Sequence, residues 1–270
     1  MSEPIENREG RLREVPVWRV GPGDPRHPVV RESVVQVVLN SRPLVRMNCL
    51  PDALDDLVLG FLASEGLIED RGAVHEIRVS ADGARIDARA DVDPYRLLAF
   101  RERIAMSLGC GGGASAAAED VPRSRSSACF RPDDVSSRMT ELHHASALFR
   151  ETGGVHAAAV TDGLVLSAFA EDIGRHNAVD KTIGRCLTQG IAFDQRLLLT
   201  TGRLCTDVLS KAIRVGLPAV VSRGAVTSRA IELAASADVA AVGFARGQEM
   251  NVYTAPWRFG LAERDETAGP

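Results

Sequence analysis

Apolar positions in the first hundred residues alternate in some stretches and repeat at helical spacing in others. Alternation predicts strands over 33–40 and 44–48 and a hairpin over 74–79 and 84–90. An amphipathic helix of about 15 residues, from Asp52 to Gly66, is predicted by the helical spacing of several leucines, Val58 and Phe61. The segment 95–106 fits either a helix or a strand. We therefore expect a frayed N-terminal segment over 1–28 and a small α+β domain over 29–106.

The second half of the chain alternates more regularly. After a helix over 137–151, short apolar runs and helical segments follow one another at 155–160, 164–169, 174–189, 196–201, 205–215, 219–222, 227–235, 239–244 and 251–254. Short strands separated by helices indicate an α/β layer around a largely parallel sheet. We assign this domain to 137–258 and a tail to 259–270.

The segment 107–136 between the two blocks is rich in glycine and small residues and poor in large apolar ones. This composition is typical of a flexible linker or loop. Cys110 lies inside it, either as an incidental cysteine or as a thiol kept accessible for reaction, because a cysteine without a chemical role is usually buried.

Four predicted strand ends carry an arginine beside glycine or another small residue. In open α/β sheets, ligands bind beyond the carboxyl ends of the strands. Glycine allows close backbone approach and arginine matches the geometry of phosphate oxygens, so the pattern predicts a nucleotide-like ligand with phosphate groups. His176 could belong to this site or could pack against a helix start, and its neighbours Asp180 and Lys181 could form a structural ion pair. The four ends lie at 171–177, 200–203, 222–224 and 244–247.

Composition narrows the range of partners. The 270 residues carry a formal net charge of −4, which gives no reason to expect a nucleic acid or an anionic membrane as partner. No apolar run reaches the roughly 18 residues of a membrane helix, and the first residues are too charged for a signal peptide. We expect a cytoplasmic protein.

The five cysteines are widely spaced, without a CxxC pair, so a zinc site or a disulfide framework is not expected. His156 and Cys205 are the residues of this chain that come nearest to the zinc deaminase pattern, HxE followed by PCxxC. Ala158 stands where that pattern needs its glutamate, and the second thiolate is missing. We therefore expect neither deamination nor protein-bound zinc.

Several strings together resemble the FdhD family of formate dehydrogenase accessory sulfurtransferases. They are GGVHAAA at 153–159, EDIGRHNAVDK at 171–181, the run 197–223 and GFARGQEMNVYT at 243–254. The resemblance implies a cytoplasmic homodimer whose C-terminal domain is a three-layer, cytidine deaminase-like unit without zinc. It also implies a sulfur carrier that takes persulfide sulfur from a cysteine desulfurase. The sulfur then passes to the bis-guanylyl molybdenum cofactor, molybdenum bis(molybdopterin guanine dinucleotide), before that cofactor enters formate dehydrogenase.

The reactive cysteine of that family lies in a CGxCG loop, which matches Cys110 here. Gly113 occupies the place of the second cysteine, so sulfur cannot pass between two neighbouring thiols of this loop, although a single thiolate is enough to accept sulfur. Cys129 is a weaker substitute. The resemblance and the strand ends together predict these cofactor contacts: Arg175, His176, Thr201, Gly202, Arg203, Ser222, Arg223, Phe244, Ala245, Arg246, Gly247, Gln248 and Glu249.

Two other functions remain compatible with the sequence. A non-catalytic chaperone would bind the cofactor through the same arginines while Cys110 carries no sulfur, a reading that the missing second cysteine favours. A small-molecule enzyme would need an acid/base pair, for which Asp172 and His176 are the close candidates.

Overall fold

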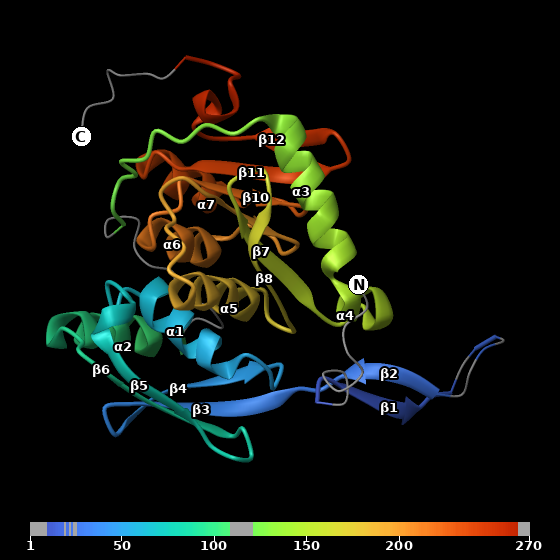
Figure 1. Cartoon of the computed structure of the whole chain (residues 1–270), viewed down its shortest axis with the longest axis vertical. Coiled ribbons are helices and arrows are strands. Elements are labelled where there is room, and N and C mark those ends of the chain that lie inside the picture. Colours follow the sequence, from blue (N-terminus) through green and yellow to red (C-terminus); the bar gives the residue numbers. More distant parts are fainter. Residues whose placement is uncertain (1–9, 19, 22, 24–25, 109–120, 264–270) are drawn as a thin grey trace.

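The computed structural model describes residues 10–18, 20–21, 23, 26–108 and 121–263, with backbone alone at 105–108. These residues form a six-stranded sheet, a four-stranded sheet and a separate two-stranded hairpin (Figure 1). The elements are β1 (Leu12–Pro16), β2 (Arg26–Val30), β3 (Ser33–Leu39), β4 (Arg42–Cys49), α1 (Leu54–Ser64), β5 (Val74–Val79), β6 (Arg85–Ala90), α2 (Pro94–Leu108), α3 (Pro132–Ala145), α4 (Ala147–Thr152), β7 (His156–Thr161), β8 (Leu166–Asp172), α5 (Arg175–Thr188), β9 (Leu197–Thr200), α6 (Thr206–Arg214), β10 (Ala219–Ser222), α7 (Ser228–Ser236), β11 (Ala240–Arg246) and β12 (Glu249–Val252).

The six-stranded sheet has the order β12-β11-β10-β9-β7-β8. Only β9, β10 and β11 are parallel neighbours, because β7 pairs antiparallel with both β8 and β9, and β12 pairs antiparallel with β11. The prediction of a largely parallel sheet was therefore wrong for the outer strands. Their connections, β7 to β8 and β11 to β12, are short turns, and short turns can join only antiparallel strands.

Alternation along the strands sends neighbouring side chains to opposite faces of this sheet. Ala157 and Ala159 of β7 pack in one apolar cluster with Val135 and Leu142 of α3. Ala158 belongs to the opposite cluster, which also contains buried residues of α5, α6 and α7. The sheet is thus covered by α3 on one face and by three helices on the other, as Figure 1 shows, and the predicted α/β class is confirmed.

The N-terminal block joins the C-terminal block through α1. This helix lies between the four-stranded sheet, of order β4-β3-β6-β5, and α5 (Figure 1). Two glycines allow the close crossing: a Cβ on Gly60 would lie 1.8 Å from the carbonyl oxygen of Asp180, and a Cβ on Gly184 would lie 1.9 Å from that of Asp56. The two blocks therefore share one hydrophobic core.

Ion pairs reinforce the same junction. Lys181 is buried and contacts Asp52 at 2.6 Å and Asp172 at 2.7 Å. Lys211 is also buried and lies 2.9 Å from Asp180. The sequence left open an Asp180–Lys181 pair, but these neighbours bind different partners. They are the only two lysines of the chain, and each holds a carboxylate of the N-terminal block, Asp52 or Glu65, against α5 or α6.

Three segments differ from the sequence prediction, and one open choice is resolved. The segment expected to be frayed contains β1, whereas 95–106, which fits either a helix or a strand in the sequence, falls within a helix, α2. The expected helix over 137–151 is broken at Ser146, between α3 and α4. The end of the expected linker is packed: Phe130 is buried and donates its backbone N–H to Arg258, next to the buried Phe259 of the expected tail. Small and polar residues around Phe130 hid this contribution to the core.

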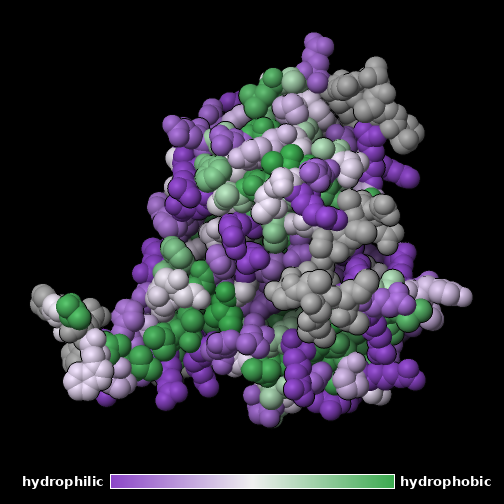
Figure 2. Space-filling view, turned by 180° about the vertical axis from the view of Figure 1, so that it is seen from behind, coloured by the Kyte–Doolittle hydropathy of each residue, from purple (hydrophilic) through white to green (hydrophobic). Residues whose placement is uncertain are grey.

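Seen from behind, apolar residues form a band beside the β1–β2 hairpin, low in the molecule (Figure 2).

Within the part of the chain that the structure describes, no helix combines the length and the apolarity needed to cross a bilayer.

Candidate functional site

The four strand ends that carry the predicted site meet at one edge of the six-stranded sheet. Strands β8, β9, β10 and β11 point the same way, so their carboxyl ends lie together. Backbone hydrogen bonds join the loops that follow: Arg223 donates to Thr200 at 3.1 Å, and Phe244 donates to Gly224 at 2.9 Å. The buried Ser222 hydroxyl donates to the carbonyl of Gly202. The loops thus form one connected surface.

Arg175 is a half-buried arginine of this edge. Its side chain packs on Gly202, where an added Cβ would lie 2.7 Å from the Cβ of Arg175. Its Nε–H is buried and has no hydrogen-bond partner among the described residues. Burial lowers the pKa of the nearby His156, and the charges of Arg175 and Arg203 lower it further. A buried donor without an acceptor, in a positive field, is suited to an anionic ligand.

The segment from Phe244 to Glu249 forms the end of β11 and the turn into β12. Phe244 has a φ of 53°, and its side chain is 40% exposed. Gly247, with a φ of 58°, lies in the turn, and Arg246 faces Glu249 in the strand register. Arg246 donates to the carbonyl of Arg223 at 3.0 Å, and its guanidinium lies 5.8 Å from the centre of the Phe244 ring. Most of this predicted contact segment is therefore an exposed hairpin tip, but Ala245 is buried in the apolar cluster under α3 and is not available to a ligand.

A cavity of about 370 Å³ lies next to His176, between the two blocks. Its walls come from β4, α1, α2, α5 and α6, and combine aromatic rings with charges of both signs. The lining residues that carry the argument below are Phe61, Phe100, Arg103, Asp207, Lys211 and Arg214. Ile104, also in the wall, precedes Cys110 by six residues in the sequence.

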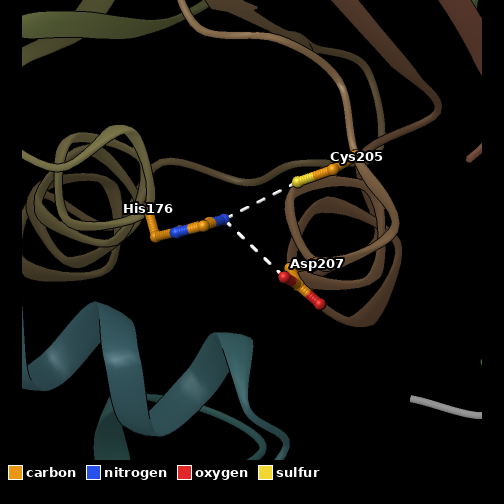
Figure 3. A group of neighbouring side chains, drawn as sticks. All are labelled: His176, Cys205 and Asp207. Atoms are coloured by element: carbon orange, nitrogen blue, oxygen red, sulfur yellow. Dashed lines mark hydrogen bonds and ion pairs between the residues drawn. The ribbon is translucent and has the colours of Figure 1, made fainter. Parts of the chain in front are cut away.

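His176 has partners that sequence reasoning did not assign to it. Its Nε2 lies 3.7 Å from the Sγ of Cys205 and 3.9 Å from a carboxylate oxygen of Asp207 (Figure 3). Burial lowers the pKa of His176 to about 4, and the charge of Arg175 contributes in the same direction, so its imidazole is neutral at neutral pH. Burial also raises the pKa of Asp207. The only sequence signal for this group is a cysteine and an aspartate two residues apart at a predicted helix start.

The acid/base pair considered for a small-molecule enzyme is not formed. Asp172 is fully buried and is bound by Lys181 at 2.7 Å and by the Asn177 amide at 2.9 Å. His176 instead faces Asp207. His156 and Cys205, the residues compared with the zinc deaminase pattern, do not pair with each other. The Nδ1 of His156 lies 3.4 Å from the Thr201 hydroxyl, and the histidine beside Cys205 is His176.

The cysteines differ sharply in their surroundings. Burial raises the pKa of Cys49 and of Cys186 to about 12, which makes both thiols unreactive at neutral pH. Cys129 is exposed and Cys205 is half-buried. Cys110, the predicted reactive thiol, lies outside the described residues.

Comparison with known proteins gives the family. A model of the FdhD/NarQ family matches residues 30–260. The sulfur carrier protein FdhD of Bacillus licheniformis is 34% identical over 229 residues, which cover 83% of this chain and 86% of that protein. The FdhD of Bacillus subtilis is 33% identical over 251 residues, or 90% and 95%. A crystal structure described as that of a formate dehydrogenase accessory protein from Desulfotalea psychrophila superposes with a TM-score of 0.74 at 29% identity, over 92% of this chain and 98% of that one. The chain belongs to the FdhD/NarQ family.

Proposed function

We propose that this chain acts in formate dehydrogenase maturation as a sulfur carrier. The Cys110 thiolate attacks the terminal sulfur of a cysteine desulfurase persulfide. A new S–S bond forms at Cys110, and the donor leaves as its thiolate. In the second step the S–S bond at Cys110 breaks, Cys110 leaves as its thiolate, and the sulfur passes to the bis-guanylyl molybdenum cofactor, the cargo destined for formate dehydrogenase. The two electrons that bring this sulfur to the sulfide level would come from the reduced metal of that cargo. The proposal includes a cytoplasmic homodimer with a deaminase-like C-terminal domain, as the family resemblance implies.

The observation that carries the proposal is the arginine-rich strand edge. Arg175 presents a buried Nε–H that lacks an acceptor among the described residues, and Arg203 and Arg223 follow β9 and β10, whose carboxyl ends lie at the same edge. Guanylyl phosphates are anionic acceptors of the kind that such guanidinium groups bind. The names of the curated relatives, sulfur carrier protein FdhD, support the same function.

The cavity beside His176 supports a meeting place for thiol and cofactor. Its aromatic wall residues Phe61 and Phe100 and its cations Arg103, Lys211 and Arg214 suit a large, partly apolar anion. Six residues of chain span at most about 22 Å, so the thiol of Cys110 stays within reach of the wall at Ile104. Gly113 in place of a second cysteine makes the proposed transfer a single-thiol reaction.

The first experiment tests the carrier step. The full chain is incubated with a cysteine desulfurase and cysteine, and intact-mass and peptide mass spectrometry locate any added sulfur. We expect one added sulfur on Cys110, absent from Cys110→Ala and retained in the matched control Cys129→Ala. If no sulfur is added while the cofactor is still bound, the protein is a non-catalytic chaperone. If the sulfur lies on Cys129, the assignment to Cys110 is wrong.

A second experiment tests the ligand edge with guanosine diphosphate as the probe. We expect calorimetric binding that weakens at least about tenfold in Arg175→Ala and in Arg203→Ala, since a charge-assisted hydrogen bond contributes about 1.5–3 kcal/mol. Arg78→Ala is the matched control, because Arg78 is exposed and lies in β5 of the other sheet. Unchanged affinity in both edge variants would remove this edge from the site.

A further inference from the structure

The start of α5 and the start of α6 bring three different donor groups together. His176 is the second residue of α5, Cys205 is the N-cap of α6, and Asp207 lies in the first turn of α6. In Figure 3 all three side chains point into the space between the two helices. Their donor atoms Nε2, Sγ and a carboxylate oxygen lie within 4.8 Å of one another.

These are the donor types that zinc uses in proteins, and the spacing is close to that of a tetrahedral site. With Zn–S of about 2.3 Å and Zn–N and Zn–O of about 2.0–2.2 Å, tetrahedral angles require about 3.6 Å between S and N and about 3.3 Å between N and O. The structure has 3.7 Å from Cys205 to His176 and 3.9 Å from His176 to Asp207. Small side-chain rotations would close the set around an ion.

The arrangement does not suit a nucleophilic Cys-His-Asp triad. In such a triad, the histidine uses one ring nitrogen toward the nucleophile and the other toward the carboxylate. Here Cys205 and Asp207 approach the same nitrogen, Nε2. A metal ion held by all three groups requires this convergence of the thiol and the carboxylate on one ring nitrogen.

The charges at the site also balance for a divalent cation. A Cys205 thiolate and the Asp207 carboxylate together supply two negative charges beside a neutral imidazole. The nearby cation Lys211 is held by Asp180 and Glu65 at 2.9 and 2.8 Å. Among the contacts that the structure describes at the Cys205 sulfur, one positive charge would repel a bound cation. It is the guanidinium of Arg175, whose Nη2 lies 3.9 Å from the sulfur.

We propose that His176, Cys205 and Asp207 bind a divalent cation of the zinc type, with the fourth coordination position left for water or a ligand oxygen. This proposal runs against the expectation of no protein-bound zinc, which rested on the wide cysteine spacing, on the comparison of His156 and Cys205 with the zinc deaminase pattern, and on the family resemblance. It does not depend on the Cys110 persulfide step, because none of the three residues carries the sulfur, although His176 is also a predicted cofactor contact and Asp207 lines the cavity proposed as the meeting place.

Cobalt(II) is the probe for the test, since a thiolate bound to Co²⁺ gives an intense near-ultraviolet charge-transfer band. The full chain is prepared as Cys110→Ser, to remove the loop thiol, then treated with chelator and titrated with Co²⁺ under reducing conditions. We expect a thiolate band and tetrahedral visible bands that saturate at one ion per chain and disappear when Zn²⁺ is added.

The variants separate a built site from adventitious binding. Adding Cys205→Ser should abolish the thiolate band, and adding Asp207→Asn should weaken Co²⁺ binding at least about tenfold, whereas Cys129→Ser should change neither. Circular dichroism and thermal melting of each metal-free variant verify that it is folded. Absence of a thiolate band in the parent protein, or its survival in Cys205→Ser, would overturn the proposal. The persulfide assay on Cys110 is read independently of either result.

Discussion

The crossing of α1 and α5 offers the sharpest test of how the two blocks are held together. In Gly184→Ala, the new Cβ would lie 1.9 Å from the carbonyl oxygen of Asp56, against an ordinary contact of at least 3.4 Å. The helices would therefore have to separate by about 1.5 Å, the difference of these distances. The obstacle is backbone, which cannot rotate away as a side chain can.

The cost follows from known core substitutions. Overpacking costs about 1–3 kcal/mol and occasionally more, while alanine returns about 1 kcal/mol of helix propensity over glycine. Because the contact is with backbone, we expect the upper end: a loss of about 2 kcal/mol in the free energy of unfolding, or a fall of about 4–8 °C in Tm. Urea denaturation followed by circular dichroism measures it.

Two further variants make the test specific. Gly60→Ala opens the same crossing, so the double variant should lose at least about 0.5 kcal/mol less than the sum of the single losses. Gly10→Ala, which adds a methyl group with no atom within 4 Å, should stay within about 0.5 kcal/mol of the parent protein. A Gly184→Ala protein as stable as the parent would refute the close crossing.

Three other outcomes follow from buried charges and thiols. Lys211→Met should lower the free energy of unfolding by about 3–5 kcal/mol in urea titrations, because it leaves buried carboxylates without their cation; a loss under 1 kcal/mol would contradict this. Burial raises the pKa of Glu65, but the charge and hydrogen bond of Lys211 at 2.8 Å, together with the charges of Arg214 and Arg103, outweigh burial and leave the pKa below its ordinary 4.5. The stability that Glu65 contributes is therefore present above pH 4.5 and lost as the pH falls through the lowered pKa. The stability difference between the parent and Glu65→Gln should shrink between pH 7 and 3, and a constant difference would exclude this linkage. At pH 8, iodoacetamide should modify Cys129 in the native protein and modify Cys49 and Cys186 only after unfolding, as peptide mass spectrometry would show.

Local patterning was enough to predict most of the second block. Runs such as 219–222 are short, apolar and bounded by helices, so the alternation itself specified β10 and its neighbours. A short turn can join only antiparallel strands. The two short turns, between β7 and β8 and between β11 and β12, therefore indicated antiparallel pairs that the alternation of strands and helices did not predict. The arginines of the strand ends could be placed at one edge because that inference needs only strand direction.

Contacts between distant segments were decided by the tertiary structure alone. Gly60 and Gly184 are ordinary helix residues in the sequence, and only the crossing of their helices makes a side chain at either position impossible. Both lysines of the chain lie buried in carboxylate clusters between the blocks, a placement that no local pattern around them predicts. The zinc deaminase pattern pairs Cys205 with His156 in the sequence, but the fold places Cys205 beside His176. The local sequence pattern shows which face of a helix or strand is apolar. The partners of a buried polar group come from other helices and strands, so the identity of those partners depends on how these elements pack.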